Sequence, residues 1–286
     1  MINKGIILAG GSGTRLSPLT KAVNKQLLPI YDKPLIFYPL SILMLSNIKN
    51  ILMIVNPGQI ENFKSLLGDG KRFGIKIQYK IQKKPKGLAD AFILGKNFIK
   101  KDNVALILGD NFFYGQSLTD KLEKSLSHNE GARIFLKNVK TPEHFGVAKI
   151  VNNRIKKIIE KPKKFISNYA ITGLYFFDNK VINYAKKLKP SKRGEIEITD
   201  ILNIYKDSES LHYEHIGRGA IWSDAGKIED MTNVSAFVQS VEKVQSIKIA
   251  CLEEIALSKK WINKKTILKN INFYGNCDYS NYLKNL

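Results

Sequence analysis

The sequence contains few of the residues that build disulfide frameworks, cysteine metal sites or membrane spans. Its 286 residues include only Cys251 and Cys277, with no CxxC spacing, so neither a disulfide scaffold nor a cysteine-based zinc site is expected. Apolar runs such as Val104–Leu108 are far shorter than the roughly 20 residues of a membrane span. The N-terminal apolar stretch is too short for a signal peptide and is interrupted by glycines. We therefore expect a cytoplasmic protein without a membrane partner.

Arginine is also scarce, although the chain is strongly basic. The net charge is +21, from 46 lysine and arginine residues against 25 acidic ones, yet only six of the basic residues are arginine. Specific readout of bases and bidentate clamping of phosphates favour arginine, and the lysines are spread along the whole chain. The charge indicates a solvated surface that attracts anionic small molecules, and no nucleic-acid partner is expected.

The first half of the chain alternates apolar strand patterns with helical patterns. Strands are predicted at 5–9, 50–55, 75–80 and 104–108, and helices at 35–47, 59–67 and 88–99. Continuous apolar strands separated by helices are typical of a parallel sheet covered on both faces. Ligands of such sheets bind at the carboxyl ends of the strands, where two candidate motifs fall.

The pattern changes after about residue 130. Strands are predicted at 132–138, 147–151, 154–159 and 174–177, a helix at 197–205, and helical spacing over 230–261, whereas 277–286 has no clear period. We interpret this half as an added sheet with helices. The predicted organisation is a core of residues 1–230, divided near residue 130, and a helical C-terminal extension of residues 231–286.

A glycine-rich turn, Gly10 to Thr14, follows the first predicted strand. Glycines there let backbone N–H groups approach phosphate oxygens closely. Leu16 occupies the place of the third glycine of a dinucleotide fingerprint, and no Gly-Lys-Ser/Thr of a Walker loop follows. Arg15 and Lys25 add two cations suited to a pyrophosphate leaving group. A tight turn with solvated cations is the alternative interpretation of these residues alone.

The same segment opens a resemblance that runs along essentially the whole chain. It begins with K-G-I-I-L-A-G-G-S-G-T-R-L and K-Q-L-L-P-I-Y-D-K-P-L-I, and continues through P-K-G-L-A-D-A-F, L-G-D-N, E-K-P, R-G-E-I-E-I-T-D and A-C-L-E-E-I-A. In these motifs the chain resembles the sugar-phosphate nucleotidyltransferases, and among them the glucose-1-phosphate thymidylyltransferases.

The resemblance implies a fold and a reaction. The implied fold is α/β and Rossmann-like: a mostly parallel mixed sheet flanked by helices, with a nucleotide-binding part (about 1–130), a small sugar-binding β subregion (about 131–230) and a helical C-terminal tail. The implied reaction transfers dTMP from dTTP to glucose 1-phosphate by a Mg²⁺-dependent in-line displacement, giving dTDP-glucose and pyrophosphate. The resemblance also implies a homotetramer and a second site for a feedback nucleotide sugar, near Glu254 and Ile255.

The resemblance further implies roles for individual residues. The residues expected at the nucleotide are Leu8, Gly10, Gly11, Ser12, Gly13, Thr14, Arg15, Lys25, Gln26, Gln82, Gly87 and Asp110. Those expected at the sugar phosphate are Asn111, Gly146, Glu160, Lys161, Ile171 and Arg193. Asp110 and Asp224 are the expected Mg²⁺ ligands, which agrees with the preference of this ion for carboxylate oxygens. The expected catalytic residues are Arg15, Lys25, Asp110, Lys161 and Asp224.

The backbone at Glu160 and Lys161, and three residues that differ from the family pattern, bear on the predicted site. Glu160 and Lys161 are adjacent, so in an extended segment they would face opposite ways, and both reach one substrate only through an irregular backbone. The family usually has threonines at Ala225 and Lys227, and tyrosine at Phe145. Two alternatives therefore stay open: a transferase for another nucleotide such as UTP or another sugar phosphate, and a nucleotide-binding regulatory protein without catalysis.

Overall fold

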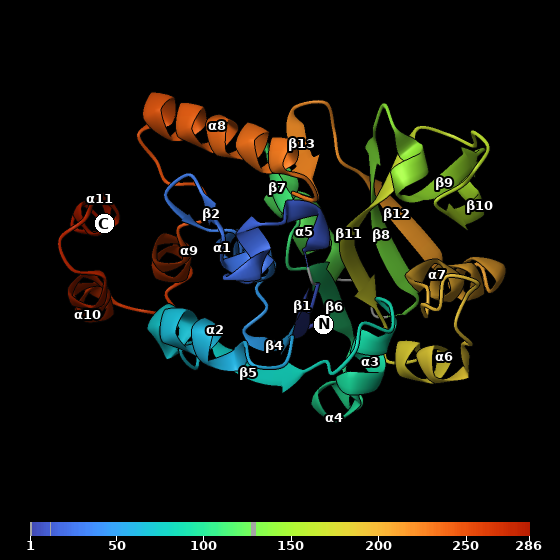
Figure 1. Ribbon diagram of the computed structural model, residues 1–286, viewed down its shortest axis with the longest axis horizontal. Coiled ribbons are helices and arrows are strands. Elements are labelled where there is room, and N and C mark those ends of the chain that lie inside the picture. The colour runs from blue at the N-terminus through green and yellow to red at the C-terminus, as the bar shows by residue number, and fades with distance from the viewer. Residues whose placement is uncertain (1, 12, 127–129) are drawn as a thin grey trace.

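A mixed sheet of nine strands forms the centre of the molecule, with helices on both of its faces (Figure 1). The structure, a computed structural model, describes residues 2–11, 13–126 and 130–286. The sheet runs in the order β10-β9-β11-β6-β1-β4-β5, with β8 beside β11 and β12 beside β8. The expected α/β class with a mostly parallel sheet in its nucleotide-binding half is confirmed.

Four parallel strands come from the first half of the chain. They are β1 (Lys4–Ala9), β4 (Asn50–Val55), β5 (Lys76–Ile81) and β6 (Val104–Leu108). β1 pairs in parallel with β4 on one side and with β6 on the other. All four were predicted to within a residue or so. β1, β4 and β6 are marked by unbroken apolar runs, as strands buried on both faces are, and β5 is marked by alternating polar and apolar residues.

Each face of the sheet has its own hydrophobic core. Ile6 and Ile7 are adjacent in β1, fully buried, and belong to different cores, as the alternation of side chains along a strand requires. One core includes α1 (Phe37–Leu45), α2 (Ile60–Leu67), α5 (Leu118–Leu126) and α9 (Leu252–Ser258). The other includes α3 (Asp90–Leu94), α6 (Val181–Lys187) and α7 (Ile198–Asp207).

The second half of the chain extends the first sheet, so our interpretation of an added, separate sheet is wrong. The long strand β11 (Tyr169–Phe177) pairs antiparallel with β6 and joins the halves. The other strands that this half adds to the sheet are β8 (Ala132–Asn138), β9 (Gly146–Val151), β10 (Arg154–Glu160) and β12 (Leu211–His215). β11 begins at Tyr169, whereas the prediction began at Leu174. The pairing of β11 with β8 shifts between Ile171 and Tyr175, and this irregularity hides the first part of the strand from a strict alternation pattern.

Three helical predictions are corrected. The helix expected at 88–99 is two short helices, α3 and α4 (Lys96–Ile99), which meet at Gly95. A Cβ on Gly95 would lie 2.9 Å from Ile6 Cδ1. The spacing over 230–261 forms two helices, α8 (Ile228–Gln245) and α9, separated at Ser246 by a left-handed backbone. The final segment contains α11 (Asp278–Leu283), which follows α10 (Lys264–Tyr274).

Short elements complete the chain. Three single turns of 3₁₀-helix lie near the glycine-rich loop: η1 (Thr14–Leu16), η2 (Leu19–Lys21) and η3 (Lys25–Leu27); two more are η4 (Lys71–Phe73) and η5 (Pro142–His144). Two small antiparallel ribbons are β2 (Pro29–Ile30) with β3 (Lys33–Pro34), and β7 (Phe112–Gly115) with β13 (Ala220–Ser223). The β7–β13 ribbon was not predicted, and it brings the Trp222–Lys227 segment next to the end of β6.

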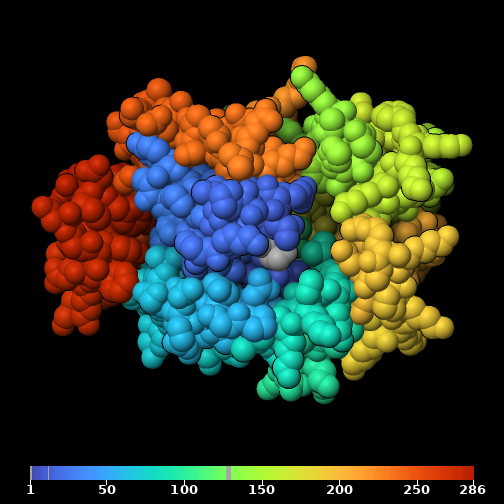
Figure 2. All heavy atoms as spheres, in the orientation of Figure 1, coloured from blue at the N-terminus to red at the C-terminus, as the bar shows by residue number. Residues whose placement is uncertain are grey.

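The C-terminal helices pack against the N-terminal half. Figure 2 shows them in red at one end of the molecule, opposite the yellow-green segment at the other end. The Glu253 carboxylate of α9 accepts hydrogen bonds from Tyr274 Oη at 2.8 Å and Tyr279 Oη at 2.7 Å, which ties the last two helices to α9. Among the described residues, no helix has the length and apolar character needed to cross a bilayer. The division of the chain at residue 230 stays a prediction.

Candidate active site

The loops after β1 and β6 lie at the same edge of the sheet, because the two strands are parallel neighbours. The backbone N–H of Gly109 donates to Leu8 O at 2.9 Å, so the loop after Leu108 crosses directly beside the glycine-rich turn. A Cβ on Gly109 would lie 3.1 Å from Gln26 Cγ. Small residues here keep the centre of this edge open between the two loops.

The glycine-rich turn is built by local contacts. Gly13 has a left-handed backbone, with φ of 62°, a conformation that glycine adopts without strain. Its carbonyl accepts a hydrogen bond from Thr20 Oγ1 at 2.9 Å. Ser12 lies outside the described residues. Gly13 and the exposed Thr14 shape the turn without lining either cavity described below.

The first cavity, of about 190 Å³, holds most of the residues predicted for the nucleotide. Of these it is lined by Leu8, Gly10, Gly11, Gln26, Gln82, Gly87 and Asp110. Gln26 is 2% exposed, and within the described chain its Oε1 atom is buried with no hydrogen-bond partner. Buried polar atoms are almost always satisfied, so this Oε1 atom is an unsatisfied hydrogen-bond acceptor in a side chain that lines the cavity.

Gly87 and Gln82 form one wall of this cavity. Gly87 has φ of 102°, and a Cβ there would lie 2.4 Å from Ile196 O, so only glycine allows this close approach of two backbones. Gln82 follows β5 and is 4% exposed. Its Nε2 atom donates to Asp90 Oδ2 at 2.9 Å.

The second cavity, of about 270 Å³, collects the residues predicted for the sugar phosphate. All six of them line it, namely Asn111, Gly146, Glu160, Lys161, Ile171 and Arg193, together with Arg15, Asp110 and Asp224. The two cavities share Leu88, Leu108, Asp110 and Glu195, so two ligands can meet beside Asp110.

Glu160 and Lys161 both reach the second cavity, which an extended backbone would forbid. Lys161 has a left-handed backbone, with φ of 43°, immediately after β10 ends. Its N–H donates to Phe145 O at 3.0 Å, which closes the strand pairing. Burial is the main cause that raises the pKa of Glu160, and the negative charge of Glu197 is the second. The predicted irregularity is thus present at Lys161.

Arg193 is held at the cavity by carboxylates. Its Nη1 atom lies 3.5 Å from Glu160 Oε1 and 3.6 Å from Glu197 Oε1, and its Nη2 atom lies 3.3 Å from Glu195 Oε2. The turn that carries it is closed by the hydrogen bond from Gly194 N to Ser191 O at 2.8 Å. The guanidinium therefore has a fixed direction but keeps 39% of its side chain exposed, enough to contact an anion.

Asp110 and Asp224 form an acidic pair with a single bound lysine. The Lys25 Nζ atom donates to Asp110 Oδ2 at 2.6 Å and lies 3.5 Å from Asp224 O. Lys25 is 5% exposed. Burial and then the negative charge of Asp110 raise the pKa of Asp224. The pair is under-neutralised, since Lys25 contacts the carboxylate of Asp110 but only the backbone carbonyl of Asp224, and no lysine or arginine of the described residues forms an ion pair with the Asp224 carboxylate.

The loop around Asp224 keeps its shape despite the replaced threonines. Ala225 is fully buried with φ of 41°, and the Gly226 N–H donates to Asp224 Oδ1 at 3.2 Å. Lys227 is exposed at the start of α8, where its N–H donates to Asp230 Oδ2 at 3.0 Å. Its side chain does not line the second cavity, so repulsion between Lys227 and a metal ion at Asp224 is not built into the site.

The residues present fit a hard divalent cation. Carboxylate oxygens are the ligands that Mg²⁺ prefers, and protein sites often supply only one or two of them, with substrate phosphates and water completing the shell. Asp110 and Asp224 meet that requirement, and the excess negative charge of the pair favours a cation. Within the described residues no cluster of three or more acidic, histidine or cysteine ligands occurs, so the site does not form a complete metal cage by itself.

Comparison with known proteins identifies the family. Residues 4–241 match the family model described as Nucleotidyl transferase. The chain belongs to the nucleotidyl transferase family. It is 50% identical over 284 residues to a glucose-1-phosphate thymidylyltransferase of Neisseria meningitidis, covering 99% of both chains. It is 43% identical over 284 residues to one of Mycobacterium tuberculosis, covering 99% of this chain and 98% of the relative.

Solved structures agree with the fold of this nucleotidyl transferase. A Bacillus anthracis protein assigned to the glucose-1-phosphate thymidylyltransferases and crystallised with a sucrose matches at a TM-score of 0.77 and 42% identity, over 82% of this chain and 94% of that one. A UDP-glucose pyrophosphorylase in complex with UDP-glucose matches at a TM-score of 0.73 and 24% identity, over 84% and 100% of the two chains. The second match supports the fold alone.

Three residues that line the second cavity were not among the predicted site residues. Tyr175, Thr199 and Trp222 line the second cavity. The Trp222 Nε1 atom donates to Asn111 Oδ1 at 2.6 Å, and its ring packs against Phe145 with centroids 5.0 Å apart. Tyr175 and Thr199 lie in apolar strand and helix patterns that predict core positions, so nothing in the local sequence separates them from their buried neighbours.

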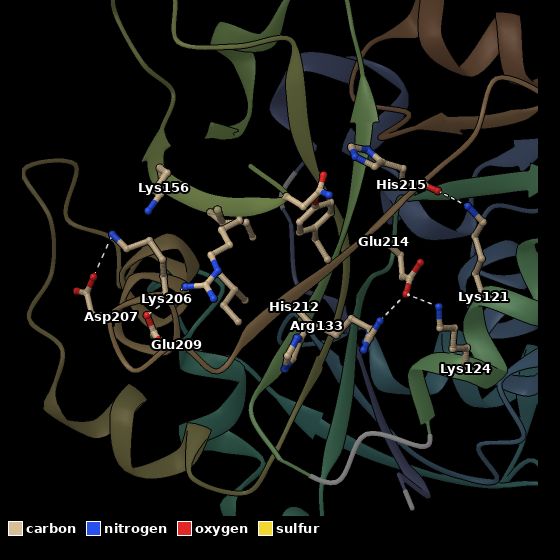
Figure 3. A pocket seen from close by; sticks show the side chains of 15 residues that line it. Lys121, Lys124, Arg133, Lys156, Lys206, Asp207, Glu209, His212, Glu214 and His215 are labelled. Carbon is tan, nitrogen blue, oxygen red and sulfur yellow. Dashed lines mark hydrogen bonds and ion pairs between the residues drawn. The ribbon is translucent and has the colours of Figure 1, made fainter. Parts of the chain in front are cut away.

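A larger cleft of about 1010 Å³ lies away from the nucleotidyl transferase site, along β8, β12 and α5 (Figure 3). It is rich in basic side chains, and several of these are paired with acidic ones inside the cleft. Arg133 and Lys124 contact Glu214, and Lys206 lies 3.1 Å from Asp207. None of the predicted site residues that the structure describes lines it. Size alone therefore does not mark the functional cavity of this molecule.

Proposed function

We propose that the protein transfers the dTMP moiety of dTTP to glucose 1-phosphate, forming dTDP-glucose and pyrophosphate. The observation that carries the proposal is the junction of two polar cavities at Asp110, one walled by glycines and glutamines and the other by Glu160, Lys161 and Arg193. The thymidylyltransferase names of relatives at 43–50% identity over nearly the whole chain support the choice of substrates.

In this proposal the nucleotide occupies the first cavity. Gln82 and the Gly87 backbone face the base, because an amide side chain both donates and accepts hydrogen bonds. The glycine-rich turn, with Gly10 and Gly11 at the cavity wall, leaves backbone N–H groups open to the phosphates. The buried Gln26 side chain supplies a further polar contact in the first cavity, since its Oε1 atom has no protein partner in the described chain.

Glucose 1-phosphate occupies the second cavity in the proposal. The Glu160 carboxylate accepts hydrogen bonds from sugar hydroxyls, next to the space that Gly146 leaves open. A Cβ on Gly146 would lie 3.1 Å from Glu160 Oε2. Lys161 and Arg193 hold the phosphate, and Asn111, Ile171 and Gly146 surround the ring.

The chemistry is a single in-line displacement. A phosphate oxygen of the sugar attacks the α-phosphorus of the nucleotide, and the bond to the pyrophosphate oxygen breaks. A phosphate dianion is already nucleophilic, so the chain needs to orient it and to neutralise charge, without a general base. In this proposal Arg15, at the second cavity, and Lys25, in contact with Asp110, balance the charge that develops on the leaving pyrophosphate.

A Mg²⁺ ion is part of this proposal. Asp110 and Asp224 would hold it, and it would supply neutralisation of the phosphate charge during the displacement. A homotetramer, a cytoplasmic location and a feedback site for a nucleotide sugar near Glu254 and Ile255 also stay predictions, which the family resemblance supports.

The test is a pyrophosphate-release assay with purified protein, glucose 1-phosphate and Mg²⁺. We expect turnover with dTTP, and formation of dTDP-glucose confirmed by mass spectrometry. A parallel series with UTP, and with other sugar 1-phosphates, separates the proposed reaction from that of a related transferase. Nucleotide binding without turnover under any of these conditions would instead favour a regulatory protein and overturn the proposal.

A further inference from the structure

Asp90 is a buried carboxylate that the proposed reaction does not use. It lies in the first turn of α3 and is 7% exposed. Its one described side-chain hydrogen bond is the one that Oδ2 accepts from Gln82 Nε2 at 2.9 Å, and no lysine or arginine of the described chain forms an ion pair with it. Burying a carboxylate without a cation is costly, so the contact with Gln82 needs a reason.

The contact fixes which way the Gln82 amide faces. An ionised carboxylate can only accept hydrogen bonds, whereas an amide has one donating and one accepting end. Asp90 therefore engages the Nε2 end, and Oε1 turns the other way. That atom lies against the glycine-rich turn, since a Cβ on Gly10 would be 2.7 Å from it. No donor among the described residues bonds to Oε1, and both Gln82 and Gly10 line the first cavity.

The orientation has a chemical consequence for the base. Thymine and uracil present an N3–H donor between two carbonyl oxygens, whereas cytosine presents an unprotonated N3 beside an amino group. An accepting Oε1 pairs with N3–H and repels the lone pair of cytosine N3. If the amide were free to rotate by half a turn, Nε2 would face the base and cytosine would be accepted.

We propose that Asp90 is a positioning residue that locks the Gln82 amide with Oε1 toward the base, so that the site selects thymine and uracil against cytosine. The inference rests on the proposed function, because it assigns the base to the first cavity. It explains why Asp90 is buried without a cation. It also assigns selection against cytosine to a residue that does not line the cavity.

The test uses the variant Asp90→Asn, which has the same shape. An asparagine amide can donate to Gln82 Oε1 as readily as it accepts from Nε2, so the Gln82 amide is released. We expect the ratio of kcat/KM for dTTP over dCTP to fall by about tenfold or more, as expected when one hydrogen bond at the base is exchanged for a repulsion. The ratio for dTTP over UTP should stay within about twofold, because both bases have the same edge.

Two controls separate positioning from a structural effect. Asp120→Asn makes the same chemical change at an exposed position of α5 and should leave all ratios unchanged. In the background Gln82→Ala, which itself reduces selection against dCTP, Asp90→Asn should have no further effect on the dTTP over dCTP ratio, as a double-mutant cycle requires of coupled residues. Equal losses for all three nucleotides in Asp90→Asn, or an unchanged dTTP over dCTP ratio, would overturn the inference.

Titration calorimetry with dTTP, UTP and dCTP measures the same ratios without turnover. Selection against dCTP that is present in the unmodified protein and weakened in Asp90→Asn supports the inference even if no dTDP-glucose forms. In that case the proposed function fails and the role of Asp90 stands. Turnover of dTTP with selection that survives Asp90→Asn would instead support the proposed function and overturn the role of Asp90.

Discussion

Two pairs of carboxylates in this molecule are neutralised in different ways. Asp32 and Glu242 are both contacted by two lysines, Lys33 and Lys248, and the four side chains join the β2–β3 ribbon to the end of α8. The acidic pair at the cavities, Asp110 and Asp224, has one lysine in direct contact. The first cluster has as many lysines as carboxylates and needs no further positive charge. The second pair has an excess of negative charge and is suited to a metal cation or to a ligand that carries a positive charge.

The difference also appears in burial. The Lys33 and Glu242 side chains are 2% and 5% exposed, so their charges depend on each other and on Lys248. Asp110 keeps 27% of its side chain exposed at the junction of the two cavities. Removing a partner should therefore affect folding at the first pair and catalysis at the second.

Lys33→Met should lower the free energy of unfolding by about 3–5 kcal/mol, because it leaves two carboxylates, one of them the buried Glu242, with Lys248 as their one remaining lysine among the described residues. Urea denaturation followed by circular dichroism measures the change. Lys33→Met combined with Glu242→Leu is the matched control, and should recover most of the loss because it removes the unpaired charge. A single variant as stable as the unmodified protein would show that this cluster is not structural.

Asp224→Asn should lower kcat/KM by about tenfold to a hundredfold, through loss of a carboxylate that the proposed metal needs. The free energy of unfolding should change little, because the substitution also removes the repulsion between the negative charges of Asp224 and Asp110. Pyrophosphate release across a series of Mg²⁺ concentrations measures the effect, and half-saturation should move to higher Mg²⁺. An identical Mg²⁺ dependence in both proteins would remove Asp224 from the metal site.

Lys161→Ala and Arg193→Ala extend the comparison to the second cavity, where three carboxylates hold one arginine. Each should raise the KM for glucose 1-phosphate by about tenfold, as expected for loss of a hydrogen bond to a charged group, while the KM for dTTP changes much less. Glu209→Gln, an exposed change outside both cavities, is the control. Equal increases in both KM values would contradict the placement of the sugar phosphate.

Glu253→Gln examines a third kind of carboxylate, one surrounded by tyrosine hydroxyls. Burial raises the pKa of Glu253, so the folded protein binds a proton more tightly than the unfolded chain does. This contribution to stability is present below the unfolded-state pKa and is lost as pH rises toward the raised value. Chemical denaturation from about pH 4, near the ordinary Glu pKa, up to about pH 8 should show a steeper decline in the unmodified protein than in Glu253→Gln. Parallel curves would show that Glu253 does not titrate in this range.

Much of the nucleotide half could be predicted from the sequence. β4 and β6 match the predicted ranges, because buried parallel strands carry unbroken apolar runs between helices. The irregular backbone needed at Lys161 was also anticipated, since adjacent residues of a strand face opposite sides. The glycine-rich turn and the family motifs placed most of the cavity residues by number, and their individual roles stay predictions.

Other features depended on contacts between distant parts of the chain. The start of β11, the β7–β13 ribbon and the position of Trp222 beside Asn111 all arise from pairing across many residues, which local periodicity does not record. The contact between Gln82 and Asp90 joins the end of a strand to the start of a helix, and neither residue alone indicates it.

The α/β class, the family and the residue types at the sheet edge can be inferred from the amino-acid sequence, because they follow from local hydrophobic pattern and from contiguous motifs. The tertiary structure decided that the second half of the chain extends the first sheet, that two cavities meet at Asp110, and that one acidic pair is balanced while the other is not. The physical reason is that burial and charge balance are properties of surroundings, and each of these surroundings is assembled from segments far apart in the chain.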